Sequence, residues 1–437
     1  MHMNRTSPKR PPAVQPPGRR PRRRWLAAAS LAACLAAAYP AAAAAGGMSA
    51  AAGTAPLNCV PGAKPAPCYS PQAYQAAYGV APLLSHGIDG RGETVVMPEL
   101  ASSAPSTDIR QDLAGFDSTF GLPPAKLQVV NTIAGSTTPY LAGDEEVTDT
   151  EVVHAIAPAA TLDVILMPAG AISSTANITA AITKVIQAGV ALHAAVISIS
   201  ASGGEHSLTR AEAAAMNQAL EQARQQHVTV VAASGDEGAI SSHEGPPVQV
   251  NMPASDPVVL GVGGTILDAA RPSGTYLGEM ARNDNTEASG GGYSSLFPRP
   301  AYQDGLARAR ATRGVPDVAA NADPATAMAL EYSDGEFQPA PGTSASAPLW
   351  AGVIALADQE AGHPLGFVNP AIYAIAQHPA YHQAFHDVTT GDNSVIWPTG
   401  VFTGYTAVPG WDPVTGWGSP DAQYLVPLLA CAARSRA

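Results

Sequence analysis

Short apolar runs alternate with longer helix-forming segments between residues 93 and 232, and this alternation constrains the fold more than any other feature. The expected strands are Glu93–Glu99, Leu127–Asn131, Thr161–Leu166, Val196–Ser200 and Val228–Ala232. The expected helices between them are Thr107–Phe120, Glu145–Ala157, Ala176–Ala188 and Leu208–Gln226. Almost continuously apolar strands joined through helices are typical of a mainly parallel sheet with helices on both faces. We therefore expect an α/β fold that carries its functional groups at the carboxyl ends of the strands.

Beyond Val262 the sequence is richer in glycine and turn-forming residues, until an apolar segment begins just after residue 344. This stretch predicts turns rather than further strand–helix units. A chain of 437 residues with 46% hydrophobic content can bury one large core or two moderate ones. We find no internal repeat and no pattern of a second domain, so we expect a single catalytic domain.

The first 45 residues have the composition of an export signal. Arg22–Arg24 precede the alanine-rich run Ala27–Ala38, and Ala41–Ala45 offers small residues for cleavage. Paired arginines in this position resemble a twin-arginine signal. The apolar run ends by Tyr39, which is too short to span a bilayer comfortably. We expect a secreted protein without a membrane span, with residues 46–67 as a linker; a lipobox-like sequence ending at Cys34 leaves a lipid anchor as the alternative.

Eight of the 23 basic residues lie before Gly46, which leaves 15 basic against 35 acidic residues and a formal charge of −20. Nucleic-acid binding needs clustered Lys and Arg, so we expect no nucleic-acid partner. Export also suits the cysteines, because Cys59 and Cys68 could pair in an oxidising compartment. In that case Cys431 is left over.

The segment Gly342–Pro348 places Ser344 directly behind a glycine turn, at the start of the apolar segment Leu349–Ala357. A helix N-terminus presents unpaired N–H groups and a positive dipole end, which stabilise an oxyanion. Serine is a weak nucleophile and needs a base. The His-Gly-Thr-His sequence that supplies this base in subtilisins is missing from the chain.

Two acidic segments offer another base. Glu145 and Asp149 stand four residues apart on one face of an expected helix, where buried carboxyls would share a proton. A solvated acidic first turn would explain the same pattern. Asp236, in the glycine turn after the last expected strand, is either a turn-former or an acid that donates to an oxyanion.

Together, Glu145-x-x-x-Asp149, Ser-Gly-Asp236 and Gly-Thr-Ser344-x-Ser-x-Pro resemble the sedolisins, serine-carboxyl peptidases with a subtilisin-like fold. Further segments in the same order are similar to landmarks of that family: Tyr69–Tyr74, Gly87–Gly92, His154–Pro158, Pro253–Ser255, Gly261–Thr265, Gly290–Ser294 and Pro316–Val318. The resemblance covers residues 68–433 and implies a subtilisin-like catalytic domain there.

The resemblance also implies the catalytic roles. Ser344 attacks the scissile carbonyl, Glu145 takes its proton, and Asp149 orients Glu145. Asp236 stabilises the oxyanion, with help from the Ser344 N–H group. Glu145 must be ionised while Asp236 keeps its proton, which is best met at acidic pH. Glu99 matches a further acid that supports the pair in some relatives, although Ala201 stands where those relatives have tryptophan.

One structural calcium ion is implied in the same way. The segments 386–391 and 408–412 resemble the calcium-binding loops of the family. The implied ligands are two carboxylates and three backbone carbonyls, from Asp387, Val388, Val408, Gly410 and Asp412. Where the family usually has glycine this chain has Val408, whose carbonyl can serve only if its φ is negative.

These observations predict a secreted, monomeric endopeptidase that cleaves proteins or peptides in acid. One alternative is a conventional subtilisin-like protease that uses His154, which lies on the same expected helix as Glu145. The other is a catalytically inactive, calcium-stabilised binding or surface protein.

Overall fold

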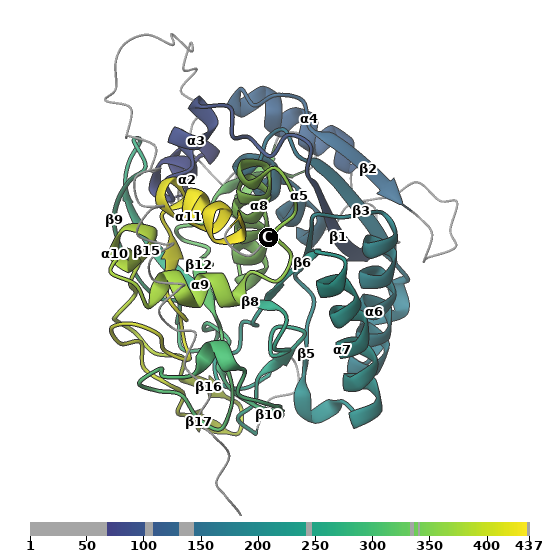
Figure 1. The fold of residues 1–437 in the computed structure, drawn as a ribbon, viewed down its shortest axis with the longest axis vertical. Coiled ribbons are helices and arrows are strands. Elements are labelled where there is room, and N and C mark those ends of the chain that lie inside the picture. The colour runs from purple at the N-terminus through teal and green to yellow at the C-terminus, as the bar shows by residue number, and fades with distance from the viewer. Residues whose placement is uncertain are drawn as a thin grey trace, which may run out of the picture.

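The computed structural model describes residues 68–100, 108–130, 144–241, 247–332, 336–339 and 341–434. A twisted eight-stranded sheet runs through its centre, in the order β12-β8-β6-β4-β1-β3-β2, with β9 paired to the C-terminal part of β8 (Figure 1). Its strands are β1 (Thr94–Leu100), β2 (Lys126–Val130), β3 (Thr161–Met167), β4 (Val196–Ile199), β6 (Thr229–Ala233), β8 (Leu260–Ala270), β9 (Thr275–Ala281) and β12 (Val318–Asn321). Neighbouring strands are parallel, except that β9 is antiparallel to β8. The predicted parallel α/β fold is confirmed.

Helices cover both faces of this sheet. On one face α5 (Asp144–Ile156) packs against α8 (Thr343–Ala361), with α4 (Ile109–Phe120) and α11 (Ala422–Arg434) at their sides. On the other face α6 (Thr175–Ala191) packs against α7 (Arg210–Gln225), as Figure 1 shows at the right.

Successive residues of β1 point to opposite faces, as the pleat requires. Val95 and Met97 join the core under α5 and α8, whereas Val96 joins the core under α6 and α7. This two-sided burial is why the central strands are apolar at nearly every position.

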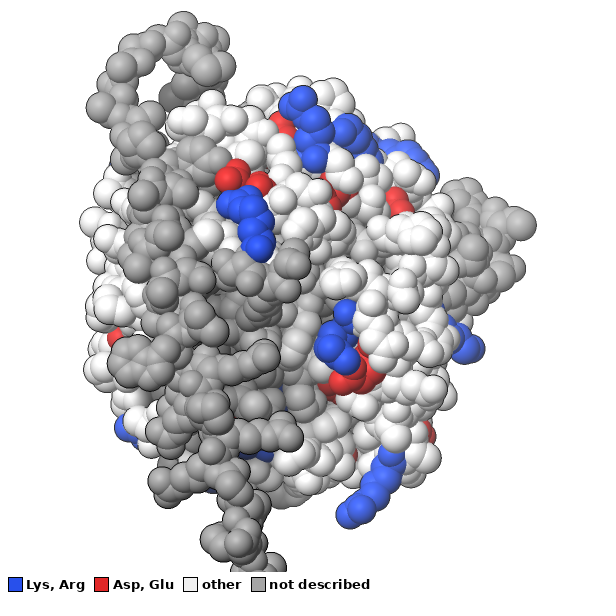
Figure 2. Space-filling model, in the orientation of Figure 1, with Lys and Arg blue, Asp and Glu red and all other residues white. Residues whose placement is uncertain are grey.

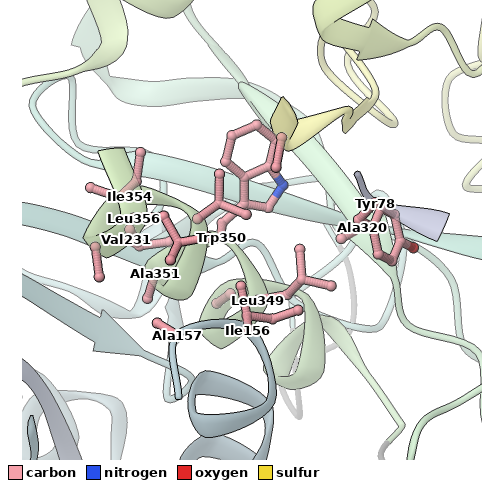
Figure 3. Packing of buried hydrophobic residues seen from close by; sticks show 14 of the residues in the cluster. Tyr78, Ile156, Ala157, Val231, Ala320, Leu349, Trp350, Ala351, Ile354 and Leu356 are labelled. Carbon is pink, nitrogen blue, oxygen red and sulfur yellow. The ribbon is translucent and has the colours of Figure 1, made fainter. Parts of the chain in front are cut away.

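Helix α8 lies in the centre of the larger core. Its residues from Ala345 to Asp358 are all buried, and Trp350 is fully enclosed between Leu349, Ile354 and the sheet (Figure 3). The Trp350 indole donates its N–H to the backbone oxygen of Ala319, 2.8 Å away, so the one polar atom of this side chain is satisfied. The element that carries Ser344 is therefore held on all sides.

The expected helices and strands before residue 233 are confirmed with small shifts at their ends. The helix expected from Leu208 begins at Arg210, because Thr209 caps it: the Glu212 N–H donates to Thr209 Oγ1, and the Glu212 carboxylate accepts from the Thr209 N–H. The expected ends at Thr107 and Asn131 lie outside the described residues.

The prediction for residues 262–343 was wrong in one respect, because this stretch contains strands as well as turns. Besides β8, β9 and β12 it holds β10 (Gly292–Pro298) paired with β11 (Thr312–Val315), and β13 (Ala329–Tyr332) paired with β14 (Glu336–Pro339). Glycine has a low strand propensity, so runs such as Gly261–Thr265 hide β8 from a reading of the sequence.

The remaining elements are short and connect these layers. The helical ones are α2 (Pro71–Ala77), α3 (Ala81–Ser85), α9 (Asn369–Ala376), α10 (Tyr381–Ala384), and the 3₁₀ turns Ala169–Ser173, Glu205–Ser207 and Ala301–Gln303. The extended ones form three small pairs: β5 (Gly203–Gly204) with β7 (Asn251–Met252), β15 (Phe385–His386) with β18 (Ser419–Pro420), and β16 (Val395–Trp397) with β17 (Gly400–Phe402).

Cys68 is disulfide-bonded, as expected for an exported protein, whereas its expected partner Cys59 lies outside the described residues. The expectation that Cys431 is left over is wrong, because Cys431 is disulfide-bonded as well. The prediction failed because Cys431 is far from the other cysteines along the chain, and separation along the chain does not show which residues are close in space. The predicted export signal, the predicted linker and Cys34 also lie outside the described residues.

Within the described ranges, none of the helices combines the length and the apolar character needed to cross a bilayer. On the described part of the face in Figure 2, Lys and Arg lie interspersed with Asp and Glu rather than gathered in one basic patch.

Candidate active site

A cleft of about 780 Å³ opens at the carboxyl ends of three adjacent strands, β1, β4 and β6. Its described lining includes Glu99 and Leu100 at the end of β1, Ser200–Gly203 after β4, and Gly235–Glu237 after β6. Two helices add residues at their N-terminal ends, Glu145 from α5 and Ser344 from α8. Three of the four predicted catalytic residues, Glu145, Asp236 and Ser344, thus line one cavity.

Ser344 is the second residue of α8 and is partly exposed to this cleft. The first N–H groups of a helix have no partner within the helix, so they are available to a ligand at this end. The Ser344 carbonyl accepts a bond of 3.3 Å from the Ser200 hydroxyl, which ties the serine to the end of β4. In the described part of the chain, Ser344 Oγ itself makes no hydrogen bond.

Gly342 makes the turn that delivers this serine. Its φ is +90°, a conformation that residues with a side chain rarely adopt. A Cβ atom at this position would also lie 3.1 Å from Asp236 Oδ2, closer than the neighbouring carboxyl accommodates without moving. Glycine here serves both the turn and the close approach of Asp236.

The Gly290–Gly292 segment supports Asp236 from behind. The Gly290 N–H donates to Gly235 O at 2.7 Å, and the Ala288 N–H donates to Asp236 O at the same distance. A Cβ atom on Gly290 would lie 2.3 Å from Ser234 O, so the two loops can approach only because residue 290 is glycine.

Asp149 lies one helical turn behind Glu145 and is fully buried. Its Oδ1 accepts from the Ser200 hydroxyl at 2.7 Å. Burial and the nearby charge of Glu145 raise the pKa of Asp149 well above its usual range, although hydrogen bonds from Glu99 and Ser200 oppose the shift. The expected solvated acidic turn therefore describes Glu145, which is exposed, but not Asp149.

Glu99 completes this group of carboxyls. Burial, followed by the charge of Asp149, raises the pKa of Glu99 well above its usual range. One oxygen of each side chain, Glu99 Oε1 and Asp149 Oδ2, is buried without a donor in the described part of the chain. A proton held between the two carboxyls satisfies both oxygens. The group forms although Ala201, rather than a tryptophan, lines the cleft next to it.

Asp236 has a different environment on the opposite side of the cleft. Its Oδ1 accepts from the Thr343 N–H at 2.8 Å and from Arg282 Nη1. Its Oδ2 lies 3.4 Å from Thr343 Oγ1. The second nitrogen of the guanidinium, Arg282 Nη2, donates to Glu287.

His154 does not take part in the cleft. It lies in the last turn of α5 and is fully buried, with Nε2 2.8 Å from Asp117 Oδ1 and 2.9 Å from Pro123 O. The helix that places Glu145 at the cleft therefore carries His154 away from it, beneath α4. Among the described residues that line the cleft, none is a histidine.

The five predicted calcium ligands come together at a separate place. Both oxygens of Asp387 accept from the Gly410 N–H at 3.1 Å, and Asp412 Oδ2 accepts from the Val408 N–H at 3.0 Å. The Thr415 hydroxyl lies 3.4 Å from Val388 O and touches Asp412.

These five residues could bind a hard cation only if backbone carbonyl oxygens serve as ligands beside the two carboxylates. In the described part of the chain no three His, Cys, Asp or Glu side chains form a metal site, so the ion would depend on carbonyl oxygens. Asp412 is fully buried, and none of the described ion pairs neutralises it. The φ of Val408 is not among the positive values, so its carbonyl meets the condition set by the sequence.

Sequence reasoning missed Arg282 and Glu287. A single arginine in the run Ala281–Asp284 resembles any surface arginine, and its partner Asp236 lies 46 residues earlier. No local pattern marks such a pair. A signal would come only from knowing that β9 and the loop after β6 meet at the same cleft.

Comparison with known proteins agrees with this geometry. The family model of the subtilases matches residues 128–418. Kumamolisin from Bacillus sp. (strain MN-32) is 35% identical over 373 residues, which cover 82% of this chain and 62% of kumamolisin. Human tripeptidyl-peptidase 1 is 33% identical over 263 residues, 54% of this chain and 43% of that protein. The chain thus spans less than two thirds of these relatives.

A solved structure shares most of the architecture. Pseudomonas sedolisin, a serine-carboxyl proteinase complexed with two molecules of pseudo-iodotyrostatin, matches with a TM-score of 0.70 and 26% sequence identity. The match covers 83% of this chain and 97% of that one.

Proposed function

Because the chain belongs to the subtilase family and, within it, to the sedolisins, we propose that it is a serine-carboxyl endopeptidase that hydrolyses peptide bonds in proteins in an acidic, extracellular setting. One observation carries this proposal: Ser344, Glu145 and Asp236 come from three distant segments and line a single cleft without a histidine among its described residues. The relatives supply the reaction class, and the cleft supplies the residues.

In the proposed reaction Ser344 Oγ attacks the scissile carbonyl and Glu145 takes the hydroxyl proton. The tetrahedral intermediate collapses to an acyl-enzyme as Glu145 returns the proton to the leaving amine, and water then hydrolyses the ester by the same route. Asp149 orients Glu145 from behind, while Ser200 and Glu99 hold Asp149. Acid is required because Glu145 must be a carboxylate while Asp236 carries a proton.

The oxyanion would form beside the N-terminus of α8. The donors proposed for it are the Ser344 backbone N–H and the protonated Asp236 carboxyl, because the Thr343 N–H already donates to Asp236 and the Ala345 N–H to Gly342 O. Substrates are extended protein or peptide chains, because the cleft is open and its floor is made of strand ends.

We also assign one structural calcium ion to Asp387 and Asp412, with the carbonyl oxygens of Val388, Val408 and Gly410. The support is the buried Asp412 carboxylate and the hydrogen bonds that bring the segment of Asp387 and Val388 against the segment from Val408 to Thr415. The ion would neutralise the two carboxylates and fix the loop before α11; it takes no part in catalysis.

The experiment that tests the function compares the wild type with Ser344→Ala, Glu145→Gln and His154→Gln on denatured protein at about pH 4. We expect Ser344→Ala and Glu145→Gln each to lower kcat by about 10⁴-fold or more, as loss of a nucleophile or base does. His154→Gln should keep kcat within about threefold, because His154 lies outside the cleft.

Two outcomes would overturn the proposal. Equal activity in wild type and Ser344→Ala would indicate a binding protein without catalysis. Loss of activity in His154→Gln together with full activity in Glu145→Gln would indicate a histidine-based protease.

A further inference from the structure

Arg282 is a buried arginine at the edge of the cleft. It follows β9 directly, and only 2% of its side chain is exposed. Its own N–H donates to Gly264 O at 3.1 Å, and its carbonyl accepts from the Ser289 N–H at 3.0 Å. The backbone is therefore fixed on both sides, and the guanidinium extends from a rigid base toward the loop after β6.

The guanidinium joins two carboxylates. Arg282 Nη1 donates to Asp236 Oδ1, and Arg282 Nη2 donates to Glu287 Oε2. Burying an arginine is costly unless its donors are matched, and these two partners match both terminal nitrogens.

Arg282 is the one cationic side chain among the described residues that line the cleft. The carboxyl groups of the same lining are those of Glu99, Glu145, Glu146, Asp236, Glu237 and Glu287. Of these, Arg282 forms ion pairs with Asp236 and Glu287. Its contacts with carboxyl groups are thus confined to one wall of the cleft.

The two oxygens of Asp236 are occupied unequally. Oδ1 accepts from two N–H donors, the Arg282 guanidinium and the Thr343 backbone. Among the described residues, the one hydrogen-bond partner of Oδ2 is the Thr343 hydroxyl at 3.4 Å, and that hydroxyl accepts from the Gly235 N–H at 3.1 Å. A carboxyl oxygen that accepts from a guanidinium and an amide has no place for a proton. The proton of the acid form therefore belongs on Oδ2.

We propose that Arg282 is a positioning residue of the peptidase: it holds Asp236 by Oδ1 so that Oδ2 carries the proton donated to the oxyanion. The inference rests on the proposed function. It adds no covalent step, because the proton stays on Oδ2, is shared with the oxyanion while the tetrahedral intermediate exists, and remains there when it collapses. Glu287 accepts from the other terminal nitrogen and so holds the guanidinium beside Asp236.

The inference assigns graded effects to this chain of contacts. Arg282→Met removes the donor to Oδ1, so the Asp236 carboxyl can rotate and misplace its proton. We expect kcat to fall about 10- to 100-fold, with KM within about threefold, because the contact matters in the transition state. Arg282→Lys should recover part of the loss, since an ammonium can donate to Asp236 but lacks the two terminal nitrogens with which arginine binds Asp236 and Glu287 together. Glu287→Gln, with 54% of the Glu287 side chain exposed, should cost less than either.

A double-mutant cycle distinguishes positioning from a structural role. Asp236→Asn alone should lower kcat about 10²- to 10³-fold, and Arg282→Met in that background should lower it by no more than about threefold further. A peptide aldehyde, which forms a tetrahedral adduct with the serine, gives a second readout. Its inhibition constant should weaken in Arg282→Met by the same factor as kcat falls.

Arg299→Met is the matched control, because Arg299 also pairs with an aspartate, Asp304, but outside the cleft lining. It should change neither kcat nor the inhibition constant. All values are referred to folded protein, and if Arg282→Met does not fold, Arg282→Lys takes its place in the cycle.

Full kcat in the folded Arg282 variant would overturn the proposal, as would independent, multiplying losses in the cycle. Activity that is absent from the wild type, or unaffected by Ser344→Ala, would instead reject the proposed function, and this inference with it.

Discussion

The two walls of the cleft hold their carboxyl groups in different ways. On the α5 wall, Asp149 and Glu99 are buried side by side with a hydroxyl donor, Ser200, and their close neighbours are further carboxyls. On the opposite wall Asp236 is only partly buried, with 28% of its side chain exposed, and it is bound by a guanidinium. The first pair is placed to share a proton, whereas one oxygen of Asp236 accepts from a cation and leaves the other oxygen for a proton.

The difference suits the two walls to different steps of the proposed reaction. Carboxyls buried side by side hold a proton between them to higher pH, which limits the negative charge behind the residue proposed to accept the proton of Ser344. A carboxyl with one oxygen fixed by donors keeps a constant orientation, which suits the wall that must aim a hydrogen bond. Three predictions test how far this comparison holds.

The largest effect separates Asp149 from Glu99. Asp149→Asn replaces the group that accepts from Ser200 and orients Glu145, so we expect kcat to fall about 10²- to 10⁴-fold, as for the orienting member of a triad. Glu99→Gln should leave kcat at about pH 4 within about threefold, because the amide replaces a carboxyl that already holds a proton. Steady-state kinetics of both variants at that pH provide the measurement.

The same pair tests the direction of the pKa shift. Since the pKa of Glu99 is raised, Glu99→Gln should matter more as the pH rises and the native Glu99 loses its proton. An equal, large loss in both variants at every pH would show that Glu99 orients Asp149 as a carboxylate, which contradicts the shared proton.

A second prediction extends the comparison to Glu279, outside the cleft. Hydroxyls of Tyr78 and Thr265 donate to its Oε1 at 2.9 and 2.7 Å, and Ser419 donates to Oε2. The residue is partly exposed, but its carboxyl lies among these hydroxyls, and none of the described ion pairs supplies it with a cation. Burial raises the pKa of Glu279 to about 7, although the hydrogen bonds oppose the shift.

Because this folded-state pKa lies above the unfolded value, the folded protein binds more protons between the two values. The stabilising contribution is complete below the unfolded pKa and is lost as the pH rises through about 7. We expect the free energy of unfolding of Ser344→Ala, used to prevent self-cleavage, to be larger at about pH 4 than at about pH 8 by roughly 1 to 3 kcal/mol from this group. Glu279→Gln should flatten the dependence; an unchanged slope would assign it to other carboxyls.

The third prediction concerns carboxylates whose partner would be a metal. Removing calcium with a chelator should lower the free energy of unfolding by about 1 to 3 kcal/mol, as loss of a ligand held well above its Kd does. Asp412→Asn should abolish the response to added calcium, and isothermal titration measures it directly. Identical melting curves with and without chelator would remove Asp387 and Asp412 from the list of metal ligands.

Much of this molecule could be predicted from its sequence. The strands up to Ala233 are apolar because they are buried on both faces. Gly342 predicts the turn before Ser344, because glycine readily adopts the positive φ that this turn requires. The missing histidine directs attention to Glu145 and Asp149. Glu145 lines the same cleft as Ser344, and the Ser200 hydroxyl contacts both Asp149 and the Ser344 carbonyl.

The rest depends on contacts between distant segments. Strand β8 begins with Leu-Gly-Val-Gly-Gly, a pattern that suggests a turn until the close packing of Ser289 and Ala322 explains its glycines. The pairing of Arg282 with Asp236 follows from the meeting of β9 with the loop after β6, and no spacing along the chain encodes it. Likewise, Glu145 and Asp149 lie on the same face of α5, so the exposure of the first and the burial of the second depend on how far along that face neighbouring segments cover it.

The parallel order β6-β4-β1 has a consequence for how such a site changes over time. Asp236, Ser200 and Glu99 follow or end three adjacent strands, and neighbouring strands are held about 4.8 Å apart by backbone hydrogen bonds alone. Their lateral spacing is therefore independent of the side chains mounted on them. A residue at one strand end, such as Ala201, can be exchanged without moving its neighbours, so each position beside the serine can change separately while the distances across the site are preserved.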